Sequence, residues 1–200
     1  MMWGVLRIRV SRRAVRLGIF SLLVAGSVLL VGCTSDANDR ATRLIALLLR
    51  ASDLPPGWQR DHGGIGNWDR EREDIVSRFV SFRGVPERQR AGVLVWQELI
   101  DYPSANHAGD EFADIVQKEI PPVAWSWPEQ VDFDSQAIQI QLACRSTSSE
   151  PMSCRSVAQY GNFVSVIYAN VFEEQWLTME DLERLLESID KRLAAARDQP

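Results

Sequence analysis

QAIQIQLACRSTSSEPMSCRSVAQYGNFVSVIYA, residues 136–169, decides the fold, because it contains three consecutive segments that each predict a β-strand. In residues 136–144 two sets of residues alternate, which is typical of a strand with one face in the core and the other facing water. The core-facing set is Ile138, Ile140, Leu142 and Cys144, and the water-facing set is Gln139, Gln141 and Ala143. Gly161-Asn162 is a favourable two-residue turn, so residues 154–160 should form a hairpin with residues 163–169.

The two cysteines of this stretch fix a register for the first two strands. If Cys144 faces Cys154 across an antiparallel hairpin, a disulfide closes the core-facing side. The same register opposes Leu142 to Ser156, Ile140 to Ala158 and Ile138 to Tyr160. The alternative to the disulfide is a pair of free buried thiols.

Two further strands are predicted upstream, at about residues 75–83 and 92–101, joined by the long connection GVPERQRAG. The second is apolar on both faces at residues 93–96, which indicates a central strand covered by helices. The stretch at residues 62–74, with its glycines and mixed charges, is typical of a surface loop.

Three amphipathic helices are predicted. The first runs to about residue 52 after a cap at Asn38 or Asp39, the second begins at Ser104, and the third begins at a capping box of Thr178 and Asp181. Their apolar stripes are, in turn, Ala41, Leu44, Ile45 and Leu48; Ala105, Ala108, Phe112, Ile115 and Val116; and Leu182, Leu185, Leu186, Ile189 and Leu193. We expect an α+β fold, an antiparallel sheet of about five strands with two or three helices packed on it, as a single domain at residues 41–200.

The first 33 residues have the layout of an export signal. Five arginines lie within residues 1–16, and the uncharged run LGIFSLLVAGSVLLV at residues 17–31 is shorter than the roughly 20 residues of a membrane span. The run ends in Leu30-Val31-Gly32-Cys33, which resembles the bacterial lipobox. The resemblance implies that residues 1–32 are removed as a signal peptide, that Cys33 carries the lipid and that residues 33–40 form a short tether.

Some alternatives remain at this end of the chain. The segment could be an uncleaved signal anchor with an incidental cysteine. Ser11-Arg12-Arg13 partly resembles a twin-arginine signal, but Arg16 stands where that pattern has an apolar residue, so ordinary secretion is preferred. The sequence leaves open which membrane holds the anchor.

The number of cysteines and the net charge agree with a location outside the cytoplasm. Lipidation of Cys33 leaves Cys144 and Cys154 as one pair, which an oxidising envelope compartment would join. Removing five arginines from the 22 basic residues leaves 17 against 27 acidic residues, a net charge of −10. Such a balance argues against nucleic acid as a partner and leaves lipid as the contact with the membrane.

The body of the chain resembles small actinobacterial and chloroflexal envelope lipoproteins, PsbP-like domains and the extracytoplasmic sensor domain of certain bacterial serine/threonine kinases. The shared features are LPPGW at residues 54–58, an Ala-rich helix after the first hairpin, and a cysteine-bracketed hairpin leading to YGNFVSV at residues 160–166. The sensor-domain likeness implies a ligand-binding cleft by analogy, and no functional residue carries over.

Few residues of the chain are candidates for a catalytic role. His62 and His107 are the only histidines, so a serine or cysteine nucleophile has few bases, and His107 is more simply a neighbour of a helix N-terminus. The acidic pairs at residues 132–134 and 173–174 lack the spacing of a calcium loop. We therefore expect no catalytic residue, no metal and no cofactor.

Trp125-Ser126-Trp127-Pro128 is the feature with most promise for binding. Trp125 and Trp127 could form a stacking platform for a sugar ring or for an apolar side chain of a partner. The competing interpretation, which we favour, is that the two rings cover an open end of the core. The preferred hypothesis is a non-enzymatic lipoprotein that binds a small envelope ligand or a protein partner. The alternatives are a carboxylate-dependent hydrolase and a structural accessory of an envelope complex.

Overall fold

The computed structural model describes residues 36–61, 74–84, 93–121, 125–126, 134–147, 150–172 and 177–198. Residues Arg40–Pro200 form one compact unit, distinct from Met1–Asp39, and the description below concerns that unit. Cys33, His62 and Trp127 lie outside the described residues, as do the predicted signal peptide and the loop at residues 62–73.

Six strands form one sheet, in which every neighbouring pair is antiparallel. They are β1 (Trp58–Arg60), β2 (Val76–Gly84), β3 (Val93–Asp101), β4 (Gln139–Thr147), β5 (Glu150–Tyr160) and β6 (Phe163–Val171), in the order β1-β2-β3-β6-β5-β4. The predicted α+β class with an antiparallel sheet is confirmed. The expected count of about five strands missed β1, which is three residues long and shows no alternation from which a strand could be predicted.

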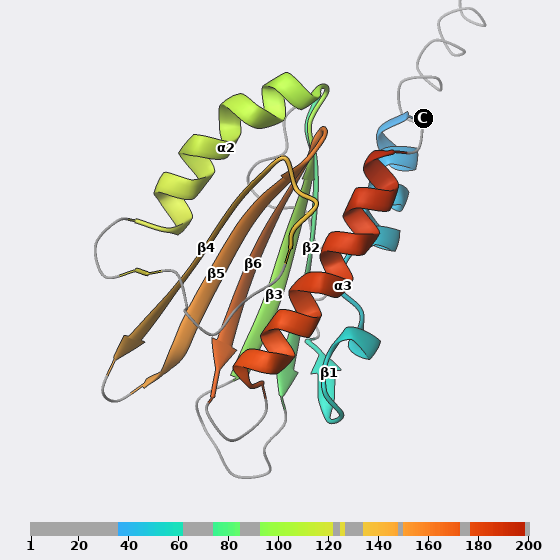
Figure 1. The fold of residues 1–200 in the computed structure, drawn as a ribbon. Coiled ribbons are helices and arrows are strands. Elements are labelled where there is room, and N and C mark those ends of the chain that lie inside the picture. Colours follow the sequence, from blue (N-terminus) through green and yellow to red (C-terminus); the bar gives the residue numbers. More distant parts are fainter. Residues whose placement is uncertain are drawn as a thin grey trace, which may run out of the picture. The chain divides into compact units, whose positions relative to one another are not determined.

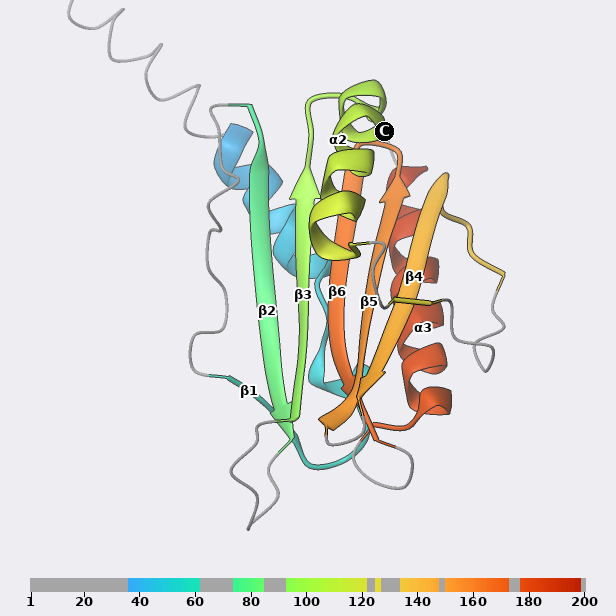
Figure 2. The same cartoon turned by 90° about the vertical axis from the view of Figure 1, so that its left-hand side faces the viewer.

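Helices lie on both faces of this sheet (Figure 1). One face carries α2 (Ala105–Glu119), and the other carries α3 (Met179–Arg197) with the helical residues 40–47. Strand β3 lies between β2 and β6, so the prediction of a central strand covered by helices is confirmed. Figure 2 shows that α2 lies over only the half of its face where β3 ends.

The larger core lies between the sheet and α3. The Thr178 hydroxyl accepts a hydrogen bond from the Asp181 N–H at 3.2 Å, and the Asp181 carboxylate accepts from the Thr178 N–H at 3.0 Å, so the predicted capping box is present. The predicted stripe of α3, Leu182, Leu185, Leu186, Ile189 and Leu193, is buried throughout. Burying five such side chains is a main source of stability here, at about 1.5–3 kcal/mol each.

The smaller core lies under α2. Ser104 caps the helix by accepting from the His107 N–H at 3.2 Å, and Ala108, Phe112 and Ile115 are buried. Val116 is half-buried, and Ala105 is exposed, contrary to the predicted stripe. Ala143 was expected to face water but is only 2% exposed, because it belongs to this second core.

The predicted register of the first hairpin is confirmed over most of its length. Cys144 pairs with Cys154, Leu142 with Ser156 and Ile140 with Ala158. The ladder starts at Gln139 opposite Gln159, one residue after Ile138, which is 57% exposed and not part of the core. Gly161, with φ +60°, and Asn162 form the predicted turn, so Tyr160 pairs with Phe163.

The predicted first helix differs from the observed one at both ends. Asn38 and Asp39 lie inside a helix that already includes residue 36, so neither is its cap. The helix stops at residue 47 because the Leu49 N–H leaves the helical ladder and donates to the buried Gln97 side chain at 2.6 Å. Ile45, expected in the core, is 41% exposed.

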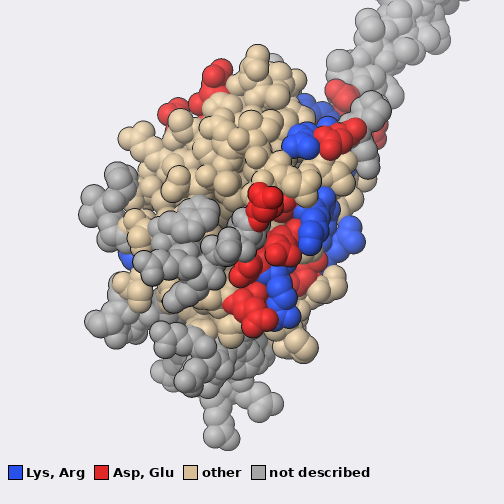
Figure 3. All heavy atoms as spheres, viewed as in Figure 1, with Lys and Arg blue, Asp and Glu red and all other residues tan. Residues whose placement is uncertain are grey.

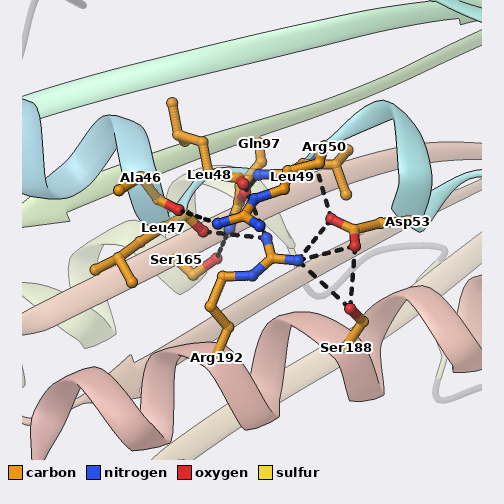
Figure 4. A network of polar contacts seen from close by, with 10 residues as sticks. All are labelled: Ala46, Leu47, Leu48, Leu49, Arg50, Asp53, Gln97, Ser165, Ser188 and Arg192. Carbon is orange, nitrogen blue, oxygen red and sulfur yellow. Dashed lines mark hydrogen bonds and ion pairs between the residues drawn. The ribbon is translucent and has the colours of Figure 1, made fainter.

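Arg192 of α3 ties the end of this helix to the C-terminal half of the molecule (Figure 4). Its guanidinium donates to the Leu48 carbonyl at 2.8 Å and to both carboxylate oxygens of Asp53 at 2.8 Å. Asp53 lies in the short 3-10 helix η1 (Ala51–Asp53) and also accepts from the Arg50 N–H at 2.8 Å. One arginine thus satisfies both a helix C-terminus and a partly buried acid.

Asp53 should make stability depend on acid pH. Burial raises its pKa, but the hydrogen bonds from Arg192 and Arg50 and the charge of Arg192 outweigh this, so the pKa lies below the usual 3.8. A group whose pKa is lower in the folded state stabilises above its unfolded pKa, and that contribution is lost as the pH falls through the folded value. Urea midpoints should therefore fall more steeply below about pH 4 in the native chain than in Asp53→Asn. Parallel pH profiles for the two proteins would contradict this role.

Candidate functional site

The candidate site lies on the α2 face of the sheet, next to the C-terminal end of α2. We call it the aromatic–arginine surface. It consists of half-buried Trp96, Trp125, Arg155, Tyr168 and Asn170 together with exposed Arg145. Aromatic rings beside arginines are the composition that recurs in binding surfaces.

Strand register brings the central members together. Trp96 of β3 faces Tyr168 of β6, and Tyr168 faces Arg155 of β5. These three side chains therefore form one row across three neighbouring strands, where directly opposed Cβ atoms lie about 4.5–5.5 Å apart. The rings of Trp96 and Tyr168 are nearly parallel, at 21°, with centroids 6.4 Å apart.

Arg155 is the cation at the centre of the surface. Its guanidinium carbon lies 5.2 Å from the Trp125 ring centroid and 5.6 Å from that of Tyr168. One terminal nitrogen donates to the carbonyl of Glu119 at 2.6 Å and to its carboxylate at 3.2 Å. The Arg155 Nε is buried and has no hydrogen-bond partner among the described residues. A buried donor without an acceptor is costly, which singles this group out as one that needs a further partner.

Trp125 reaches the surface from the open edge of the sheet. Its neighbour Ser126 forms an isolated antiparallel bridge with Cys144 of the edge strand β4, through backbone hydrogen bonds of 3.1 and 2.8 Å. The guanidinium carbon of Arg145 lies 5.3 Å from the Trp125 ring centroid, so two cations lie over one indole. Trp125 also packs against the core under α2, which is the core-covering role that we favour for it.

A polar group borders the row. Asn170 and Ser153 face each other on β6 and β5, and Arg145 faces Ser153 from β4. The Asn170 side-chain oxygen accepts from the Tyr168 hydroxyl at 2.7 Å and from the Ser153 hydroxyl at 3.3 Å. Because both bonds use the oxygen, the Asn170 amide N–H groups have no acceptor among the described residues and can donate to a ligand.

The other candidate residues from the sequence have different settings. Cys144 and Cys154 form a disulfide with an S–S distance of 2.02 Å, on the opposite face of the sheet from the surface. His107 lies 3.8 Å from the Glu111 carboxylate, and its ring centroid lies 5.2 Å from that of Tyr102. Among the described residues there is no group of three or more His, Cys, Asp or Glu that could hold a metal ion.

A cavity of about 360 Å³ lies elsewhere, between the turn at residues 52–56 and α3. The two carboxylates that line it already accept hydrogen bonds, Asp53 from the Arg192 guanidinium and Asp181 from the Thr178 N–H. Figure 3 shows acidic and basic side chains gathered over α3, and the structure pairs several of them, such as Arg184 with Asp181 at 2.6 Å. This cavity therefore has a structural explanation.

Sequence reasoning found Trp125 but missed the residues around it. Arg145 and Arg155 each follow a cysteine, so the disulfide register already placed both on the face opposite the disulfide, two pair positions apart on neighbouring strands. The turn at Gly161 then places Tyr168 opposite Arg155. That signal was present in the sequence, whereas the contribution of Trp96 required the order of strands in the sheet.

Comparison of the chain with protein-family models, with curated proteins and with solved structures found no match. In the part of the chain that the structure describes, no helix has the length and apolar character needed to cross a membrane.

Proposed function

We propose that the protein is a lipid-anchored binding protein of the cell envelope that holds its ligand at the aromatic–arginine surface. The observation that carries this proposal is the setting of Arg155, a cation between two aromatic rings with a buried donor that no group among the described residues satisfies. Rigid aromatic side chains with a few convergent polar groups are characteristic of ligand sites.

The disulfide and the N-terminal sequence support a location in the cell envelope. The Cys144–Cys154 bond joins neighbouring strands, and such bonds persist mainly outside the reducing cytoplasm. The lipobox-like Leu30–Cys33 sequence supplies the anchor. Together they favour a folded domain displayed on the extracytoplasmic side of a membrane.

Binding is favoured over hydrolysis by the use made of the buried acids. The carboxylates buried in the described residues, Glu98, Asp101 and Asp190, all accept hydrogen bonds from side chains. Their donors are, in that order, Ser77 at 2.7 Å, Arg40 at 2.7 Å and Tyr160 at 2.8 Å. Each of these acids thus has a structural role. By contrast, the Arg155 Nε of the aromatic–arginine surface has no acceptor among the described residues.

Lipidation is tested on the native protein. Mass spectrometry of the chain extracted from membranes should show a mature N-terminus at Cys33 with a diacylglyceryl thioether. Cys33→Ala should remain uncut and unlipidated, while Cys154→Ala should be processed normally. A native chain that still begins at Met1 without lipid would overturn the anchor.

Ligand binding is tested in cells with a photo-crosslinking residue at position 126 of the full chain, because Ser126 is exposed, lies next to Trp125 and leaves both arginines of the surface in place. Position 191 serves as the matched control, because Lys191 is also exposed but lies on α3. We expect a discrete adduct at position 126 and none at position 191. The same products at both positions, or no adduct at either, would contradict a ligand site on the aromatic–arginine surface.

A further inference from the structure

We infer that the ligand of the aromatic–arginine surface is an acidic saccharide, a chain of sugar rings that bears carboxylate groups. This inference rests on the proposed function, because it names the class of ligand for the same site. It is built from the charge of the surface, from its unused donors and from the polar side chains beside them.

Charge comes first. Arg145 and Arg155 bring two positive charges over the Trp125 ring, and Glu119, which pairs with Arg155 at 3.2 Å, supplies one negative charge. Among the described residues the surface keeps one positive charge, whereas the chain without the predicted signal peptide has a net charge of −10. A single surplus charge complements a monoanionic carboxylate better than a dianionic phosphate group.

The guanidinium groups of the surface have hydrogen-bond donors without acceptors among the described residues. Arg145 contacts the Trp125 ring, and none of its nitrogens has an acidic partner among the described residues. The Arg155 Nε adds a buried donor at the same place. Guanidinium groups form short, charge-assisted bonds with carboxylates, and bonds of this kind are about twice as strong as neutral ones. A carboxylate bound here would pair with the exposed guanidinium of Arg145, which has no acidic partner among the described residues.

The polar border indicates the rest of the ligand. Ser153 and Tyr168 present hydroxyls, and Asn170 has free amide donors, within one hydrogen-bonded group. Sugar hydroxyls both donate and accept, so they match a border of mixed donors and acceptors. The half-buried ring of Trp96 offers apolar area beside it for the C–H groups of a sugar ring.

The test compares two saccharides that differ in charge. The acidic probe is a disaccharide of β-1,4-linked N-acetyl amino sugars in which one ring carries a lactyl carboxylate, and the neutral probe is the same disaccharide without that group. Binding to the detergent-solubilised full chain is followed by tryptophan fluorescence. We expect the acidic probe to bind at least about tenfold tighter, a difference of one charge-assisted hydrogen bond, with an affinity that falls as salt is added.

Variants locate the contact. Arg145→Ala should weaken binding of the acidic probe about tenfold and leave binding of the neutral probe unchanged. Asn170→Ala should weaken both probes. Arg184→Ala is the matched control, because Arg184 is exposed on α3, on the other face of the sheet, and paired with Asp181 at 2.6 Å, and it should change neither. Arg145 is exposed, so its loss should not disturb folding, which thermal unfolding checks independently.

The outcomes separate the two proposals. Equal binding of both probes, or an affinity that does not respond to Arg145→Ala, would overturn the recognition of a carboxylate. If neither probe binds while the crosslinker at position 126 still captures a discrete ligand, the saccharide class is wrong and the binding function stands. If neither probe binds and nothing is captured, both proposals fail.

Discussion

Replacing Asp190 by alanine is expected to lower the free energy of unfolding by about 3 kcal/mol, because a buried acceptor with several donors disappears. Asp190 is 2% exposed and accepts from the Tyr160 hydroxyl at 2.8 Å and from the Ser135 hydroxyl at 2.6 Å. The Gln136 N–H donates to it as well, at 3.1 Å. Without the carboxylate, these donors lose their acceptor in a site that water enters with difficulty.

The state of Tyr160 makes this expectation specific. Burial raises the pKa of its phenol far above the ordinary value, and the hydrogen bond and charge of Asp190 raise it further. The phenol therefore stays protonated and acts as a donor at every pH at which the protein is folded. Asp190→Asn keeps one acceptor oxygen and should cost less than Asp190→Ala in urea unfolding. Equal and small losses in both variants would show that the network contributes little.

Removing the disulfide should have an effect of similar size. In the chain-entropy account, cross-linking Cys144 to Cys154, ten residues apart, stabilises the fold by about 3 kcal/mol because it restricts the unfolded chain. Cys144→Ala combined with Cys154→Ala should therefore lower the urea midpoint with little change in the slope. Reductant should destabilise the native chain and leave the double variant unaffected. A double variant as stable as the oxidised protein would contradict this assignment.

The hairpin that carries the disulfide was predictable in detail because three local signals agree there. Alternation in β4, the cysteine pair and the turn at Gly161 each fix the same register, which the structure confirms. Side-chain periodicity in a strand is two, so a slip of one residue would move every core residue to the other face. The same logic, applied to the residue that follows each cysteine, is enough to place Arg145 and Arg155 together from the sequence alone.

The predictions that failed concern how residues are buried or bonded by parts of the chain that are distant in sequence. Ala143 is buried because it belongs to the core that α2 completes, and the strand sequence carries no record of that helix. The first helix ends early because Gln97, 48 residues away, accepts from the Leu49 N–H. Gln97 in turn donates to the Ser165 hydroxyl of the neighbouring strand at 3.0 Å. The alternation of residues along a strand predicts apolar side chains at such buried positions, so it could not have predicted this hydrogen bond.

The two ends of the sheet have a consequence for how copies of the protein behave when crowded. At one end, Ser126 occupies the backbone groups of Cys144 on the outer side of β4. At the other, β1 is three residues long and bears exposed Gln59 and Arg60. Short, charged or already occupied edges give an incoming chain little to extend. Neighbouring molecules therefore have few places at which to join their sheets into a common fibril.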